Sequence, residues 1–308
     1  MGYLSIPNLY REEAQRILEF KRLWATEKIH GTSASVDWKG TGDKMLFDLT
    51  FFSGGCSYDL FVGLFDRDAL RGTFSEKFGM QPVTIYGEAY GGKLQGMSDT
   101  YGKFIKFVAF DVKVGDSWLA VPQAHAVAHS LGLDFVDYVE IPSTIEAIDA
   151  ERDRPSVQAV KNGITEPKLR EGVVLRPPFE CTLNNGARLI AKHKRAEFAE
   201  RSSGYPGLLD PAKKEALENA EAIVEEWVTA QRLEHVIDHI KARRGDGRDL
   251  GIEDTGAVIK EMCEDVQREA AGEVVPALLG SKDLAKAIGH KTVKMFKMRL
   301  EAGLRSIA

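Results

Sequence analysis

The stretch ATEKIHGTSASV, residues 25–36, places a lysine at the end of an apolar run, just before a bend. After Lys28, the residues Ile29, Ala34 and Val36 alternate with polar ones like a half-buried strand, and Gly31 interrupts that pattern. A buried amine loses hydration, so its pKa falls and more of it is an uncharged nucleophile. A neighbouring cation acts in the same direction. The stretch therefore predicts a reactive lysine at a strand end.

Three later segments with strand character carry charged side chains that could complete a site. TIYGEAYGG contains Glu88, LREGVVLRPP contains Glu171, and LIAKHKRAEF contains Lys192 and Lys194, two residues apart and hence on one strand face. The lysines would neutralise a polyphosphate, and the glutamates would hold a divalent cation directly or through water. Each residue alone fits a solvated strand position equally well, and a lone His30 is more often a structural hydrogen-bonding residue. Only the order and spacing of the whole set favour a site.

That ordered set resembles the covalent nucleotidyltransferases, which comprise ATP-dependent RNA and DNA ligases and mRNA capping enzymes. The resemblance is closest to nick-sealing ligases of the RNA ligase 2 type and covers roughly residues 24 to 198. It is carried by five motifs in this order: EKIHGT, YGEAYGG, FVAFDV, EGVVLRP and IAKHK. The joint pattern is highly specific.

The resemblance implies an ATP-dependent RNA ligase. The amine of Lys28 would attack the α-phosphate of ATP to form lysine-AMP, with release of pyrophosphate. The AMP would pass to an RNA 5′-phosphate, and a 3′-hydroxyl would then displace it and seal the strand. Cations and a metal would disfavour the protonated form of the lysine. The catalytic set implied is Lys28, His30, Glu88, Glu171, Lys192 and Lys194, with Mg²⁺ or Mn²⁺ held by Glu88 and Glu171.

The nucleotide-binding set implied by the same resemblance is Glu27, Ile29, Gly31, Ser33, Phe110 and Arg176. Phe110 would stack on the adenine. Glu27 would accept a hydrogen bond from the adenine amine and repel the guanine carbonyl, which favours ATP over GTP. Gly31 would let the chain turn close to the nucleotide without a Cβ clash.

Three positions depart from the pattern of the closest relatives. Ser33 stands where those relatives have asparagine, and Arg176 ends the fourth motif where lysine is more usual. An arginine expected on the strand after the nucleophile is replaced by the residues at 53–55, which are Ser-Gly-Gly. Either backbone amides of that turn replace the guanidinium, or Arg67 or Arg71 reaches into the site.

The periodicity of the sequence changes near residue 205, from short strand-like runs to helical spacing. Residues 1–205 read as an α+β nucleotidyltransferase domain with ATP-grasp-like antiparallel sheets and helices. Residues 206–308 read as a small all-α domain. In the second part, Asp210 and Pro211 predict a helix start, an apolar series from Ile223 to Ile240 predicts one helix that ends near residue 245, and further helices are expected at 253–271 and 281–302.

The last expected helix carries many more basic than acidic residues and is the candidate RNA-binding surface. Val293, Phe296 and Leu300 would face the core, which leaves Lys291 and Lys294 on the far side toward phosphates. A solvated basic face is the alternative interpretation of such a run. The expected partner is RNA, as a nicked duplex or paired ends.

Composition limits the remaining possibilities. The net charge of −5 gives no general affinity for nucleic acid, so any such surface must be local. Three scattered cysteines suit a reducing compartment, and neither a secretory signal nor a membrane span is visible, so a cytoplasmic location without membrane contact is expected. An ATP-dependent DNA ligase and a capping guanylyltransferase rank lower because no C-terminal β-barrel is indicated. A non-catalytic nucleotide- or RNA-binding relative is the remaining alternative. Oligomeric state stays open.

Overall fold

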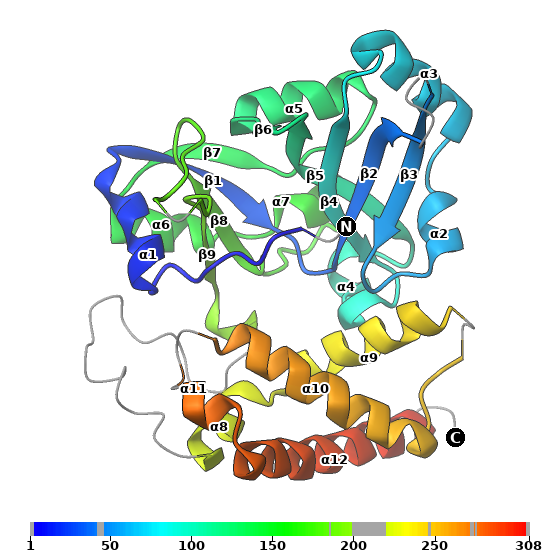
Figure 1. Ribbon diagram of the computed structural model, residues 1–308, viewed down its shortest axis with the longest axis vertical. Coiled ribbons are helices and arrows are strands. Elements are labelled where there is room, and N and C mark those ends of the chain that lie inside the picture. Colours follow the sequence, from blue (N-terminus) through cyan, green and yellow to red (C-terminus); the bar gives the residue numbers. More distant parts are fainter. Residues whose placement is uncertain are drawn as a thin grey trace. The chain divides into compact units, whose positions relative to one another are not determined.

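Two antiparallel sheets form the frame of the first part of the chain (Figure 1). The computed structural model describes residues 3–41, 46–184, 186–198, 220–245, 248–271, 274 and 276–305. The chain divides into two units, Met1–Arg195 and Ala196–Ala308, and the expected boundary at residue 205 lies outside the described residues. The sheets belong to the first unit.

The first sheet has the strand order β7-β1-β8-β9, and the second has the order β3-β2-β4-β5-β6. All the pairings between these strands are antiparallel. The strands are β1 (Arg22–Lys28), β2 (Thr32–Gly40), β3 (Phe47–Ser53), β4 (Val83–Gly91), β5 (Ile105–Val114), β6 (Ser117–Trp118), β7 (Tyr138–Pro142), β8 (Gly172–Arg176) and β9 (Ala191–Lys194). Consecutive strands β1 and β2 lie in different sheets, so the three residues between them, which include His30, cross from one sheet to the other.

The register aligns the charged motifs. In the first sheet, Lys28 pairs with Gly172, and Gly172 pairs with Lys194, so these three residues form one row across three strands. In the second sheet, Ser33 pairs with Glu88. The motifs that are far apart in sequence therefore meet at the strand ends nearest the crossing segment.

Helices of the first unit pack against both sheets, with α6 on the first sheet and α2, α3 and α5 on the second. α5 packs on β5, while α2 and α3 pack on β3, and their apolar side chains join one large core. The helices and 3-10 turns are α1 (Glu12–Gln15), η1 (Arg16–Glu19), α2 (Tyr58–Val62), α3 (Arg67–Phe78), η2 (Leu94–Gly96), α4 (Ser98–Tyr101), α5 (Val121–Ser130), α6 (Ile145–Arg152) and α7 (Val157–Lys161).

The second unit is helical over its described residues and has its own apolar core. Trp227, Ile237, Met262 and Phe296 are each less than 4% exposed there. Its elements are η3 (Ala196–Phe198), α8 (Ala220–Trp227), α9 (Ala230–Arg244), η5 (Ile252–Asp254), α10 (Thr255–Glu269), α11 (Pro276–Leu279) and α12 (Lys282–Arg305). The α+β class of the first unit and the helical character of the second are confirmed.

One local expectation needs correction. The apolar series from Ile223 to Ile240 forms two helices instead of one, because the Thr229 side chain accepts a hydrogen bond from the Arg232 amide and starts α9 anew. The helix α6 begins after Thr144, whose side chain accepts from the Ala147 amide. The expected helix start at Asp210–Pro211 lies outside the described residues.

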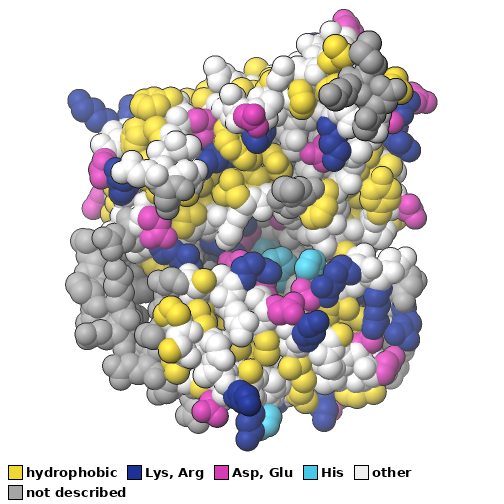
Figure 2. Space-filling view, viewed as in Figure 1, with side chains coloured by type: hydrophobic (Ala, Val, Ile, Leu, Met, Phe, Trp, Pro, Cys, Tyr) yellow, Lys and Arg dark blue, Asp and Glu magenta, His cyan; other side chains and the backbone are white. Residues whose placement is uncertain are grey.

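Charges are distributed without a dominant sign on the face drawn in Figure 2. Lys and Arg side chains alternate there with Asp and Glu side chains, and no basic field covers that face. Among the described helices, none combines the length and apolar character that crossing a membrane requires.

Candidate active site

A buried carboxylate lies at the centre of the row of charged residues. Glu171 directly precedes β8, is 1% exposed, and accepts contacts from three cations or potential cations. Its oxygens lie 3.0 Å from Lys28 Nζ, 2.8 Å from Lys194 Nζ and 3.4 Å from His30 Nδ1. Lys28, His30, Glu171 and Lys194 thus come from three separate motifs and meet at one carboxylate.

The electrostatics of this cluster keep Glu171 ionised. Burial alone would raise the pKa of its carboxyl, but Lys194, Lys28 and His30 outweigh that effect and hold the pKa well below its usual range. The nearest charged group to Lys28 is therefore an anion, whereas the sequence predicted mainly cations around the lysine.

Glu88 joins the same cluster from β4 but has the opposite electrostatic character. Burial raises the pKa of its carboxyl to about 8, and the nearby Glu171 adds to this, although Lys28 and a hydrogen bond from the Gly31 amide act in the other direction. At neutral pH most Glu88 is therefore protonated. Two carboxyl groups near one lysine thus have pKa values pushed far apart.

Gly31 is required by the approach of β4. A Cβ built at this position would lie 2.3 Å from the Ala89 carbonyl oxygen and 3.0 Å from Glu88 Cγ. The sequence predicted that this glycine makes room for a nucleotide, but the close neighbour is strand backbone. A side chain here would push apart the two segments that carry His30 and Glu88.

Lys192 shares a face of β9 with Lys194 and fixes the N-terminal segment. Its amide donates to the Pro7 carbonyl, and its carbonyl accepts from the Leu9 amide, both at 2.9 Å. Between the two lysines, His193 points to the other face and bonds to Asp149, 2.7 Å away. The alternation expected of this strand is thus observed.

The side chains of two residues expected to bind the nucleotide are engaged elsewhere. Glu27 accepts hydrogen bonds from the Ser156 hydroxyl (2.5 Å) and from the amides of Val157 and Gln158 (3.0 and 3.1 Å), so it caps the first turn of α7. The side chain of Ile29 is 3% exposed and belongs to the core, which leaves its backbone for any ligand. The purine-selecting role expected of Glu27 has no geometric support here.

Phe110 and Ser33 adjoin a residue that the sequence did not single out. The ring of Tyr3 meets the ring of Phe110 edge to face, with centroids 4.9 Å apart, and also packs on Tyr86 and Trp118. The Tyr3 amide donates to Ser33 Oγ at 3.3 Å. The N-terminal segment therefore packs against two of the residues expected to bind the nucleotide.

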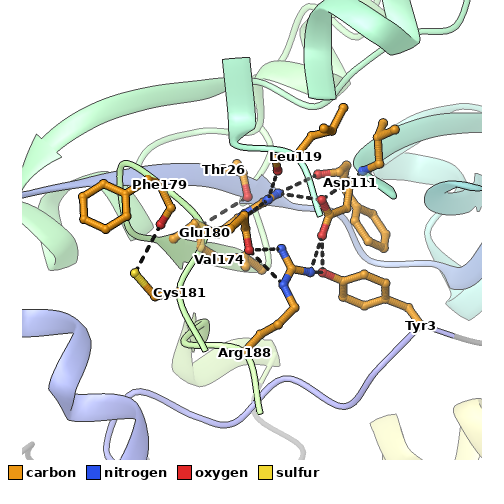
Figure 3. Close-up of polar contacts among 12 residues, drawn as sticks. Tyr3, Thr26, Asp111, Leu119, Val174, Phe179, Glu180, Cys181 and Arg188 are labelled. Carbon is orange, nitrogen blue, oxygen red and sulfur yellow. Dashed lines mark hydrogen bonds and ion pairs between the residues drawn. The ribbon is translucent and has the colours of Figure 1, made fainter. Parts of the chain in front are cut away.

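A buried ion-pair network continues from Tyr3 (Figure 3). Figure 3 shows the Arg188 guanidinium with Glu180 on one side and with Asp111 and the Tyr3 hydroxyl on the other. The hydroxyl donates to Asp111 Oδ2 at 2.5 Å, and Arg188 Nη1 lies 2.7 Å from the same oxygen. Arg188 also lies 3.9 Å above the Trp118 ring, close enough for a cation–π contact. An aspartate inside the apolar run FVAFDV signals that a partner is needed, but nothing in the sequence identifies Tyr3 or Arg188 as that partner.

Arg176, which the sequence predicts to bind the nucleotide, belongs to this network. It is 2% exposed, and its guanidinium lies 3.0 Å from Asp111 Oδ1, pairs with Glu180 and donates to the Leu119 carbonyl. These partners use the planar fork of an arginine in a way that a lysine cannot reproduce. The network joins β8 of one sheet to β5 of the other.

The two arginines considered for the turn at residues 53–55 both belong to α3. Arg71 is bound to Asp48 at 2.9 Å, and Arg67 lies 6.0 Å from the centre of the Phe51 ring. The Gly54 amide donates to the Ser33 carbonyl at 2.9 Å. Arg71 is thus engaged on the β3 side, and the choice between Arg67 and backbone amides stays a prediction.

In the second unit, the two candidate RNA-binding lysines differ. Lys294 is exposed on α12. Lys291 instead pairs with Glu225 Oε2 at 3.0 Å and donates to the Val224 carbonyl at 3.1 Å, at the C-terminal end of α8. The expectation that it faces away from the unit is wrong, because the carbonyl end of α8 attracts a cation.

The donor set suits a divalent metal that keeps other ligands. Within the described residues no group of three or more His, Cys, Asp or Glu side chains is arranged to hold a metal ion. Mg²⁺ is commonly bound by one or two carboxylates together with water and substrate phosphates. Glu88 and Glu171 fit that arrangement, because the Glu171 carboxyl is ionised and the Glu88 carboxyl can ionise.

Comparison with known proteins gives one family and a set of similar structures. The model of a family described as RNA ligase matches residues 21–194, which include all the residues of the cluster around Glu171. A comparison with curated proteins gives no match.

Similar solved structures include several forms of a Naegleria gruberi RNA ligase. A mutant in its apo form has a TM-score of 0.47 and 16% identity over 64% of this chain and 56% of that chain. A mutant with ATP and Mn has a TM-score of 0.48 and 15% identity over 64% and 57%. A form with PPi has a TM-score of 0.43 and 16% identity over 65% and 57%. The match thus spans little more than half the length of these relatives.

The raised pKa of Glu88 predicts a pH-dependent stability difference for Glu88→Gln. The carboxyl binds its proton more tightly in the folded state, with a pKa of about 8, than in the unfolded state, so its contribution to stability is complete below about pH 4.5 and is lost progressively as the pH rises toward 8. Glutamine cannot ionise and escapes that loss. The melting temperature of the variant should therefore match that of wild type near pH 4.5 and exceed it increasingly up to pH 8. Parallel curves would contradict the shift.

The Tyr3 hydroxyl predicts a measurable contribution to folding. Tyr3→Phe keeps the ring contacts but removes the donor to Asp111, so we expect the free energy of unfolding to fall by about 1–2 kcal/mol in urea titrations. Tyr58→Phe is the matched control, because Tyr58 is 58% exposed and its change should stay within about 0.5 kcal/mol. Equal stability of the two variants would show that the hydroxyl adds nothing to the network.

Proposed function

The chain belongs to the RNA ligase family, and we propose that it joins RNA 3′-hydroxyl and 5′-phosphate ends in an ATP-dependent reaction through lysine-AMP on Lys28. The observation that supports this most directly is the convergence of Lys28, His30 and Lys194 on the buried carboxylate of Glu171, within 3.4 Å. All four residues lie in the segment that matches the family.

In the proposed first step, Lys28 Nζ attacks the α-phosphorus of ATP, a N–P bond forms, and the P–O bond to pyrophosphate breaks. Lys194 faces the same carboxylate as Lys28 and would pair with the phosphate oxygens that gain charge during transfer. Lys192, on the same face of β9, would extend that cationic row. His30 would orient the pyrophosphate that leaves. Each role depends on residues held in register by β1, β8 and β9.

Glu171 and Glu88 would hold Mg²⁺ or Mn²⁺ together with phosphate oxygens. Bound there, the metal supplies charge neutralisation of the triphosphate. Glu171 would then share its oxygens between the metal and the contact with Lys28 Nζ, which lies 3.0 Å away. Glu88 must lose its proton to become a ligand, so metal binding should release protons below about pH 8.

The nucleotide base would stack on Phe110, beside Tyr3 and Ser33. The preference for ATP over GTP has less support than the phosphate chemistry, since Glu27 is occupied by α7. The second and third steps, transfer of AMP to the 5′-phosphate and displacement by the 3′-hydroxyl, would use the same phosphate-binding residues. A DNA ligase is disfavoured because the described residues of the second unit form helices instead of a β-barrel.

The second unit would contribute to RNA binding through one exposed stripe of α12. Lys286, His290, Lys294 and Lys297 are exposed and follow one another at intervals of four, four and three residues, so they share a helix face. None of these three lysines forms an ion pair with another described residue. The stripe is about 16 Å long at 1.5 Å per residue, enough to meet several phosphates.

Lys28→Ala tests the covalent step. Incubation with labelled ATP and Mg²⁺ should give a wild-type protein whose label survives denaturation and alkali but is released by acid, as expected of a P–N bond. The variant should give no labelled protein, because no other amine is expected to take over the attack. Lys39→Ala, which removes an exposed lysine of β2, should label like wild type. Mass spectrometry that finds AMP on Lys192 or Lys194 of the wild type would contradict the assignment.

The stripe of α12 predicts a salt-dependent effect on RNA binding. Replacing Lys286, Lys294 and Lys297 by alanine should reduce the slope of log K against log salt for a nicked RNA duplex by about 2 to 3, since each phosphate contact contributes nearly one. Lys291→Ala is the control: it should lower stability by about 1 kcal/mol through lost contacts with α8 and leave the slope unchanged. A triple variant with the wild-type slope would exclude the stripe from RNA binding.

A further inference from the structure

The connection between β4 and β5 presents one strongly exposed aromatic side chain. Phe104 is 80% exposed, more than the other large apolar side chains of the described residues. Single exposed apolar residues are common and need no explanation by themselves. Phe104 differs from such residues in its charged neighbours and in the rigidity of the backbone that carries it.

The neighbours of Phe104 are lysines. Lys93 and Lys103 are exposed, and neither forms an ion pair with another described residue. The exposed Lys106 follows two positions later and donates to Asn162 Oδ1 at 3.0 Å. Asp99 is the acidic residue of the same connection. Exposed aromatic rings combined with basic side chains are the means by which proteins bind the bases and phosphates of single-stranded nucleic acid.

The backbone beneath this aromatic residue is held tightly. The Gly92 amide donates to the Gly102 carbonyl at 2.9 Å, which closes the base of the connection. Gly91 has a φ of +79°, and a Cβ there would lie 2.6 Å from the Phe104 carbonyl oxygen, so the two chain segments are in direct contact. Phe104 is thus presented by a fixed turn and loses little conformational entropy when a ligand binds.

The same connection is tied to the nucleophile motif. The buried Tyr101 hydroxyl accepts a hydrogen bond from the His30 amide at 3.3 Å. Asn162, which accepts from Lys106, also donates to the Tyr101 carbonyl at 3.0 Å. Phe104 therefore has a defined position relative to the segment that joins β1 and β2, although it lies outside the family motifs that carry the chemistry.

We propose that Phe104, with Lys93 and Lys103, is a stacking platform for a base of the RNA next to the joint. The ring would stack on an unpaired or terminal base, and the two lysines would bind the adjoining phosphates. This proposal rests on the proposed RNA ligase function and adds a substrate contact to it. It predicts that binding of RNA and formation of lysine-AMP respond differently to the same substitution.

The test uses the full chain and an RNA duplex with a nick, labelled with 2-aminopurine at the nick. Phe104→Ala should weaken binding about tenfold or more, the scale for loss of one base–aromatic stack, and should abolish the quenching of 2-aminopurine. Phe104→Trp should keep both within about threefold. Labelling by ATP in the absence of RNA should be unchanged in each variant. Tyr58→Ala, which removes an exposed aromatic residue from α2, is the matched control and should bind RNA like wild type.

Several results would overturn the proposal. Wild-type affinity of Phe104→Ala would show that the surface serves another partner or none. Wild-type affinity of Phe104→Leu would show that apolar contact, and not stacking, is what matters. A wild-type protein that forms lysine-AMP and fails to bind the nicked RNA would exclude the platform while preserving the first chemical step. Failure of wild type to form lysine-AMP at all would contradict the proposed function itself.

Discussion

The burial of Glu171 is the constraint on which the active site depends. A carboxylate that is 1% exposed is tolerated only if charged partners surround it, and Lys28, Lys194 and His30 provide them. The requirement works in both directions, because the carboxylate also fixes the ends of the two lysines before any nucleotide arrives. Three strands must then hold one register, since a shift by one residue would turn each lysine to the other face. The geometry of the site is thus a consequence of compensating one buried charge.

A second buried carboxylate, that of Asp111, likewise requires charged partners and so links segments of the fold. Asp111 is fully buried and is compensated by Arg176, Arg188 and the Tyr3 hydroxyl, which come from a strand, a loop and the N-terminal segment. Removing any one partner would leave part of this charge uncompensated. The two sheets are therefore linked by charge as well as by apolar packing. Tyr3, one member of that link, packs its ring against Phe110, so the position of this ring depends on a residue distant in sequence.

Local patterns in the sequence predict much of the fold, and the limits of that prediction are physical. Alternation gives β2, β4, β5, β8 and β9, and the motifs identify the residues that meet at Glu171, since both depend on short-range spacing. The sequence does not reveal which side chains pair with residues far away along the chain. It does not show that Glu27 caps α7, that Arg176 serves Asp111, or that Lys291 binds the end of α8. In each case the charged side chain was expected to face a ligand, but in the structure it pairs with a group inside the fold.

The two glutamates of the site illustrate how one cluster can accept a polyphosphate and a metal in turn. At neutral pH the ionised Glu171 balances one of the two lysines, while the pKa of Glu88, raised to about 8, keeps that carboxyl mostly neutral. The cluster therefore has a net positive charge, which suits phosphate oxygens. A divalent cation brings two further positive charges, and these favour loss of the Glu88 proton. The raised pKa of Glu88 beside the ionised Glu171 thus limits the negative charge that the two carboxyls carry together at neutral pH.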